Sequence, residues 1–129
     1  MEKVREHRVA KLQEALKHAQ SVAKCISGKL PNSAVIMIGS YARGDFNKWS
    51  DIDLLVVTSS ELPPNPLRRL EVIQECITTN MPIEPVVLTV DELMKRLRKK
   101  DPLAVEAVKH GLILYDMIGF RKRIQSGYK

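Results

Sequence analysis

Residues 39–57 read Gly-Ser-Tyr-Ala-Arg-Gly-Asp-Phe-Asn-Lys-Trp-Ser-Asp-Ile-Asp-Leu-Leu-Val-Val. An apolar run, residues 34–38, comes before Gly39 and Ser40, and a second apolar run begins at Ile52. In a strand, side chains two residues apart point to the same face, so Asp51 and Asp53 would project side by side. The stretch therefore predicts two buried strands, a Gly-Ser turn after the first, and a pair of carboxylates at the start of the second.

A paired carboxylate next to a Gly-Ser turn indicates a site for a cation and a phosphate. Two adjacent carboxylates repel each other unless a cation or a proton lies between them. Mg²⁺ is typically held by one or two carboxylates and completed by substrate phosphates. Gly39 lets the backbone approach a phosphate, and Ser40 offers both a hydroxyl and an N–H group. The alternative is a plain turn followed by solvated acidic residues.

This stretch resembles the minimal nucleotidyltransferases of the DNA polymerase beta-like superfamily. Their pattern is Gly-Ser, ten intervening residues, and then Asp-x-Asp, often with Arg-Gly-Asp shortly after the Gly-Ser. The chain fills this pattern with Gly39, Ser40, Asp51 and Asp53, and the extension with Arg43, Gly44 and Asp45. The resemblance extends over residues 33–116.

The resemblance implies a mixed sheet with the site at one edge, nucleotidyl transfer from a nucleoside triphosphate such as ATP, and two Mg²⁺ ions about 3.5–4 Å apart. It assigns Asp51 and Asp53 to the metal and Gly39 and Ser40 to the triphosphate. The superfamily also has a third carboxylate on a neighbouring strand, which binds metal and accepts the proton of the nucleophile. Glu84 is the candidate here, although the family more often has aspartate and the following Pro85 is unusual. The alternative for Glu84 is a surface residue on an edge strand.

The loop between the Gly-Ser turn and Asp51 adds further candidates. Arg43 either contacts a phosphate or pairs with Asp45 to brace the loop, and the second role is slightly favoured. Ser50 is expected to orient the loop before Asp51 and is assigned with Arg43 to nucleotide binding. Lys48 and Trp49 could meet the base or the acceptor, and for Trp49 a packing role is at least as well supported.

The rest of the chain predicts an α/β protein with one domain, residues 1–129, and a small mixed sheet of about four strands covered by helices. A long amphipathic N-terminal helix is expected over residues 2–27, with Gly28 as its stop, and it more plausibly covers the sheet than forms a coiled-coil arm. The family core would span residues 33–116. Further helices are expected over residues 66–78, from 90 and from 102, and further strands over 83–88 and 112–115.

Composition limits the setting of the protein. The net charge of +6 favours a polyanionic partner such as a nucleotide, a nucleic acid or an acidic protein surface. No apolar run suits a membrane helix, so the expectation is a cytoplasmic protein without a membrane partner. Cys25 and Cys76 lack metal-ligand spacing and are expected to be free thiols. Two basic runs, residues 95–100 and 121–123, are interpreted as solvated faces, with RNA or an acidic partner as the alternative.

Three functions fit the sequence. The resemblance favours an enzyme that transfers AMP from ATP to a tyrosine of a small helical HEPN-type ribonuclease toxin, which would make this chain the antitoxin. The second is a binding module that neutralises a partner by covering it. The third is nucleotidyl transfer to a small molecule or an RNA end, which ranks lower because such enzymes usually need an added domain or a dimer to form the acceptor pocket.

Overall fold

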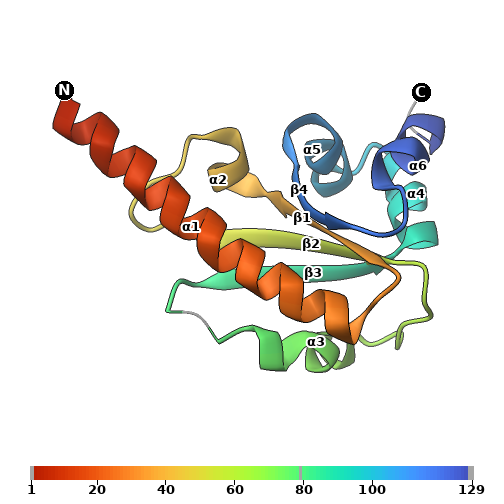
Figure 1. Ribbon diagram of the computed structural model, residues 1–129. Coiled ribbons are helices and arrows are strands. Elements are labelled where there is room, and N and C mark those ends of the chain that lie inside the picture. Colours follow the sequence, from red (N-terminus) through yellow and green to blue (C-terminus); the bar gives the residue numbers. More distant parts are fainter. Residues whose placement is uncertain (1, 79, 128–129) are drawn as a thin grey trace.

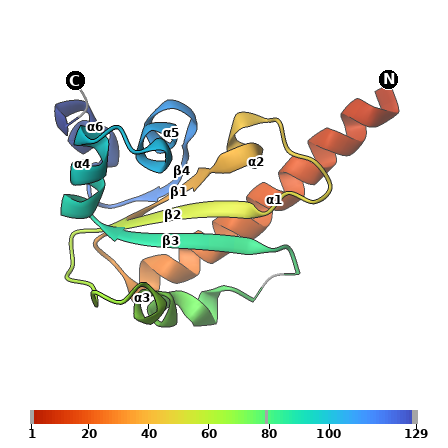
Figure 2. The same cartoon turned by 180° about the vertical axis from the view of Figure 1, so that it is seen from behind.

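The computed structural model describes residues 2–78 and 80–127 and places them in three layers, helices on both faces of one sheet (Figures 1 and 2). The long helix α1 (Glu2–Lys29) crosses one face, and α3 (Pro66–Ile73) with the short 3-10 helix η1 (Gln74–Cys76) lies on the same side. The other face is covered by α4 (Val90–Arg98), α5 (Pro102–His110) and α6 (Phe120–Gly127). In the described part of the chain, no helix combines the length and apolar character that a membrane crossing needs.

The sheet has four strands in the order β3-β2-β1-β4 and mixes parallel and antiparallel pairs. The strands are β1 (Ser33–Ile38), β2 (Ile52–Thr58), β3 (Ile83–Thr89) and β4 (Leu112–Asp116). β1 runs antiparallel to both β2 and β4, whereas β2 and β3 are parallel and are connected through α3. The expected four-stranded mixed sheet with a long N-terminal helix is confirmed.

Both faces of the two central strands are buried, which explains why their sequences are almost continuously apolar. Alternate β1 residues such as Val35 and Met37 pack under α1, while Ala34 and Ile36 pack against the helices of the opposite layer. The α1 side of the core is completed by Ala15, Ala19, Val22, Ala23 and Ile26. The expectation that this helix covers the sheet is therefore confirmed for its C-terminal half.

Side chains cap the starts of α3 and α4. The Asn65 side chain accepts from the N–H of Leu67 ahead of α3. Thr89 and Glu92 form a reciprocal capping box at the start of α4. The expected helix over residues 66–78 is too long, however, because α3 ends at Ile73 and the chain tightens into η1.

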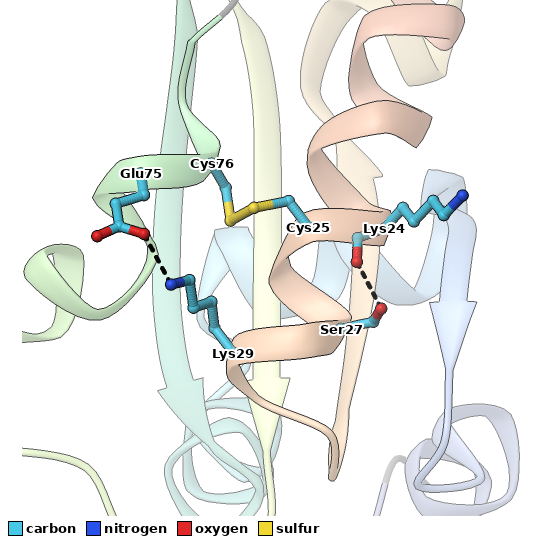
Figure 3. The surroundings of a disulfide bond; sticks show 6 residues. All are labelled: Lys24, Cys25, Ser27, Lys29, Glu75 and Cys76. Atoms are coloured by element: carbon cyan, nitrogen blue, oxygen red, sulfur yellow. Dashed lines mark hydrogen bonds and ion pairs between the residues drawn. A yellow bond between two sulfur atoms is a disulfide. The ribbon is translucent and has the colours of Figure 1, made fainter.

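The prediction of two free thiols is wrong, because Cys25 of α1 and Cys76 of η1 form a disulfide (Figure 3). The fold brings the two Cα atoms to 5.5 Å, a normal separation for a bridge. The two residues are 51 positions apart, so local sequence carried no sign of the pairing. Beside the bridge, the exposed Lys29 side chain donates to Glu75 at 2.7 Å.

A buried arginine ties α3 to α4 across the edge strand β3. The Arg69 guanidinium donates to both carboxylate oxygens of Glu92, at 2.7 and 3.0 Å, and to the carbonyl of Val87 at 3.1 Å. Its Nε donates to the carbonyl of Pro63 at 2.6 Å. This contact holds the pKa of Glu92 at about 2, chiefly through the hydrogen bonds from Arg69.

Candidate active site

The carboxylates predicted for the site gather where β1 ends and where β2 and β3 begin. Ile38, the last residue of β1, is opposite Asp53 in the antiparallel pair, and Asp53 is in turn level with Glu84 in the parallel pair. Asp51 lies just before β2, two residues upstream of Asp53. The edge of the sheet thus collects three carboxyl-bearing residues next to the turn at Gly39.

Position 39 requires glycine because the Asp53 carboxylate lies against its Cα. Its φ of +79° is in the region that favours glycine, and a Cβ built there would lie 2.1 Å from Oδ2 of Asp53. Any side chain at this position would therefore displace the carboxylate or the turn. The Gly of the Gly-Ser pair and the second Asp of the Asp-x-Asp pair are one packing unit, which gives a physical reason for their joint occurrence.

Asp53 is the carboxylate of the site whose pKa is raised by its surroundings. Its side chain is partly buried, and burial raises its pKa above the usual value, followed by the neighbouring carboxylates of Glu84 and Asp51. Arg43 acts in the opposite direction but does not cancel these effects. A group that is both partly desolvated and surrounded by like charge is poised to gain from a cation.

The segment that follows β1 is a compact turn, α2 (Gly39–Arg43), ended by Gly44 at a φ of +90°. The Ser40 carbonyl accepts from the N–H groups of Gly44 at 2.8 Å and Asp45 at 3.1 Å. Ser40 is partly exposed beside the carboxylates, and Tyr41 is buried beneath it. The turn expected at Gly39 and Ser40 is confirmed and is helical, and the assignment of both residues to a triphosphate stays a prediction.

Arg43 braces the loop, as favoured from the sequence. Its Nε donates to Oδ2 of Asp45 at 3.1 Å, and its terminal nitrogen pairs with Glu106 of α5. The hydrogen bond from Arg43 lowers the pKa of Asp45. Arg43 is exposed, and a contact with a phosphate stays a prediction.

The residues before Asp51 form a tight loop. The hydroxyl of Ser50 accepts from the N–H of Asn47 at 2.9 Å, while the N–H of Ser50 donates to the Asn47 carbonyl at 3.1 Å. Ser50 thus orients the loop as expected, and its nucleotide contact stays a prediction. Trp49 does not pack into the core, since 80% of it is exposed, and its ring lies 5.1 Å from the Lys48 ammonium.

The donor set fits a cation that shares its ligands with a substrate. Among the described residues, no three His, Cys, Asp or Glu side chains are grouped closely enough to hold a metal by themselves. Mg²⁺ commonly takes only one or two carboxylates from the protein and the rest of its ligands from water and phosphates. Asp51 and Asp53 meet that need, whereas Glu84 is exposed on the edge strand and its role as a third ligand stays a prediction.

Sequence reasoning missed two residues that contact this region from other elements. Arg8 of α1 donates to the carbonyls of Gly44 and Phe46, and Glu106 of α5 pairs with Arg43. Both lie far from the motif along the chain, so no local pattern could have identified them.

The basic runs lie away from the carboxylates. The first is in and after the C-terminal half of α4, which follows the far end of β3, and the second is on α6, which packs against α4. Lys95, Arg98, Lys99, Lys100, Arg121 and Lys122 are exposed. Neither run contributes to the site at the Gly-Ser turn.

Comparisons with known proteins agree with this fold. The family model described as "Nucleotidyltransferase domain" matches residues 19–114. A crystal structure from Sulfolobus solfataricus, provisionally named a nucleotidyltransferase, is similar with 26% identity and a TM-score of 0.65, over 87% of this chain and 89% of that chain.

Two further crystal structures share the fold at 16% identity, a level that supports no more than the fold. One is a toxin–antitoxin with AMP-PNP, with a TM-score of 0.59 over 83% of this chain and 81% of that chain. The other is a mutant of the toxin–antitoxin MntA-HpeT, with a TM-score of 0.55 over 81% of this chain and 78% of that chain. No curated protein matches the sequence.

Proposed function

We propose, since this chain belongs to the nucleotidyltransferase domain family, that it transfers a nucleoside monophosphate, AMP from ATP in the first instance, to a hydroxyl of a partner protein. The observation that carries the proposal is the close packing of Asp53 against Gly39. The Asp53 carboxylate occupies the space that a Cβ at position 39 would need. The alignment of Asp53 with Glu84 and the raised pKa of Asp53 support it.

In this proposal the residues at the sheet edge position the reactants. Ser40 and the backbone of the turn bind the triphosphate, and Asp51 and Asp53 hold Mg²⁺. When bound, Mg²⁺ neutralises charge on the phosphates and on the attacking and leaving oxygens. The acceptor oxygen bonds to the α-phosphorus, the bond from that phosphorus to the bridging oxygen breaks, and pyrophosphate leaves with the electron pair. Glu84 takes the proton of the acceptor hydroxyl.

Few of the described residues lie outside the sheet and its covering helices, so we propose that a partner protein presents the hydroxyl. Two structures with this fold are toxin–antitoxin proteins, one of them with AMP-PNP. We therefore propose a small helical toxin of the HEPN type as the partner and a tyrosine as the acceptor, with this chain as the antitoxin.

Intact-mass spectrometry tests the proposal. The protein encoded next to this one is incubated with this chain, Mg²⁺ and each of the four nucleoside triphosphates. An added mass of one or more AMP units is expected with ATP, and Asp51→Asn with Asp53→Asn should abolish it. Glu84→Gln separates the third carboxylate, since a slowed but not abolished transfer would assign it the proton-accepting role. Absence of added mass with every triphosphate would contradict the proposal.

The second candidate is a binding module that neutralises its partner by covering it. The exposure of Glu84, followed by Pro85, and the lack of a three-residue metal group among the described residues favour this reading. The double variant Asp51→Asn/Asp53→Asn separates the two. A binding module keeps its neutralising effect in this variant, and an enzyme loses it.

A further inference from the structure

The long helix α1 reaches beyond the sheet and meets the loop that follows the Gly-Ser turn (Figure 1). No described residue ahead of Ala15 is buried, although Leu12 packs against the core while partly exposed. Arg8 lies in this exposed part, yet its side chain crosses to the loop. A cavity of about 250 Å³ between the two is lined by Arg5, Arg8, Val9, Leu12, Gly44 and Phe46.

Arg8 contacts the loop in three ways. One terminal nitrogen donates to the carbonyl of Gly44 at 2.8 Å, and the other donates to the carbonyl of Phe46 at 3.0 Å. The guanidinium also lies 4.4 Å from the centre of the Phe46 ring, a cation–π distance. A planar guanidinium can make all three contacts at once, which a lysine ammonium cannot.

These contacts continue into the turn itself. Phe46 is 5% exposed and stacks on Tyr41 with the ring centres 4.6 Å apart. Tyr41 directly follows Ser40, whose carbonyl accepts from Gly44 and Asp45. Phe46 therefore contacts both the Arg8 guanidinium and the Tyr41 ring, and Tyr41 belongs to the turn that adjoins Asp53.

We infer that Arg8 is a positioning residue that holds the loop of residues 40–46 in the conformation needed to bind a nucleoside triphosphate. The inference rests on the proposed function, because it assigns the loop to the phosphates. The N–H groups of Gly44 and Asp45 donate to the Ser40 carbonyl, and Arg43 pairs with Asp45 from within the loop. Arg8 adds a contact from α1 to the Gly44 and Phe46 carbonyls, which should help to keep the loop closed. Residues that support a metal–nucleotide site from outside typically change its affinity about tenfold to a hundredfold.

Hydrogen exchange and nucleotide affinity, measured on the same variants, test the inference. In Arg8→Ala the amides of Gly44 and Asp45 should exchange about tenfold faster in the absence of nucleotide, because local opening controls exchange. The Kd for ATP with Mg²⁺, from titration calorimetry, should rise about tenfold. Arg8→Lys should fall between wild type and Arg8→Ala in both measurements. Circular dichroism confirms that each variant is folded.

Arg5→Ala is the matched control. Arg5 lines the same cavity, has the same charge, and makes no hydrogen bond or ion pair to a described residue. Arg5→Ala should leave both measurements unchanged. Equal effects of Arg5→Ala and Arg8→Ala would mean that the loss of one positive charge causes the change, and this would overturn the inference.

The remaining outcomes separate the inference from the proposed function. Unchanged exchange in Arg8→Ala overturns the inference, and so does faster exchange with an unchanged Kd in a protein that binds ATP, since Arg8 is then only structural. If the wild type binds none of the four nucleoside triphosphates with Mg²⁺, the proposed function fails. In that case the assignment of the loop to phosphates fails with it, even if exchange shows that Arg8 closes the loop.

Discussion

Gly39 makes the sharpest prediction for a single residue. Gly39→Ala should lower the free energy of unfolding by at least about 2 kcal/mol, because alanine disfavours the positive φ and its Cβ would collide with Asp53. Nucleotide binding should be lost as well, since the carboxylate must move. Urea unfolding and ATP titration measure the two effects.

Gly28→Ala is the control for this substitution. Gly28 lies in α1, and a Cβ there would meet nothing within 4 Å. Alanine favours helix over glycine, so stability should stay the same or rise by up to about 1 kcal/mol. If Gly39→Ala behaves like Gly28→Ala, the proposed packing of the turn on Asp53 is wrong.

Asp53 should make stability depend on pH in an unusual direction. Its pKa in the folded protein is raised above 3.8, so its ionisation destabilises the fold and this penalty is complete above the folded pKa. Asp53→Asn should therefore raise Tm by a few degrees at pH 7, and this gain should vanish as the pH falls below 3.8, where both states are protonated. Differential scanning calorimetry across this range measures the effect.

Mg²⁺ provides the companion measurement for Asp53. A cation that binds the folded protein raises Tm in proportion to RT ln(1 + [Mg²⁺]/Kd). Wild type should gain stability from Mg²⁺ at pH 7, and Asp53→Asn should gain much less. Equal gains in the two proteins would place the cation elsewhere.

At the residue scale, the motif was predictable and its support was not. The expectation that Asp51 and Asp53 project to the same side follows from their spacing and from the period of a strand. The contact between Gly39 and Asp53 depends on the register of β1 against β2, and the stack of Arg8 on Phe46 depends on the path of α1. Both are properties of the assembled fold.

At the scale of elements, the disulfide between α1 and η1 should stabilise the fold. A bridge across 51 residues restricts the unfolded chain, which in the chain-entropy description is worth about 4 kcal/mol and in practice about 2–4 kcal/mol. Reduction with dithiothreitol should lower the free energy of unfolding by that amount. The double variant Cys25→Ser/Cys76→Ser should be equally destabilised and insensitive to the reductant, and a reductant effect in that variant would point to another cause.

The contact of Arg69 with Glu92 links α3 to α4 and should matter more than other ion pairs. The Arg69 side chain is 11% exposed and that of Glu92 is 41% exposed, so solvent weakens the pair only in part. Glu92→Gln should cost about 1–3 kcal/mol at pH 7, because it leaves a buried guanidinium poorly paired. Chemical unfolding measures the loss.

The pH dependence of this loss has a defined sign. The pKa of Glu92 is lowered from 4.5 to about 2, so its stabilisation is complete above pH 4.5 and disappears as the pH falls toward 2. The difference between wild type and Glu92→Gln should shrink over that window. Glu75→Gln, which removes the exposed pair with Lys29, should show no measurable loss, and a loss equal to that of Glu92→Gln would refute the distinction.

At the element scale, predictions succeeded where the signal is local. Two helix starts are indicated by side chains that cap the helix within one turn, namely Asn65 before Pro66, and Thr89 with Glu92. The end of α3 has no comparable signal, because Ile77 follows Ile73 at helical spacing although the chain tightens over residues 74–76. The mixed character of the sheet came from family resemblance, and the strand order was not predicted, since periodicity does not specify which strands are neighbours.

At the scale of the whole molecule, α1 has two parts with different functions. From Leu12 and Ala15 onward it supplies residues that pack in or against the core, and in the exposed turns before Leu12 the Arg8 side chain donates to the loop of residues 40–46. Deleting residues 1–7 should therefore change the free energy of unfolding by less than about 0.5 kcal/mol and leave the Kd for ATP unchanged. Deleting residues 1–10 removes Arg8 and should weaken ATP binding as Arg8→Ala does, with the core still folded. Thermal unfolding and calorimetry compare the two truncations. A large loss of stability on deleting residues 1–7 would mean that the exposed turns of α1 support the fold by a route other than Arg8.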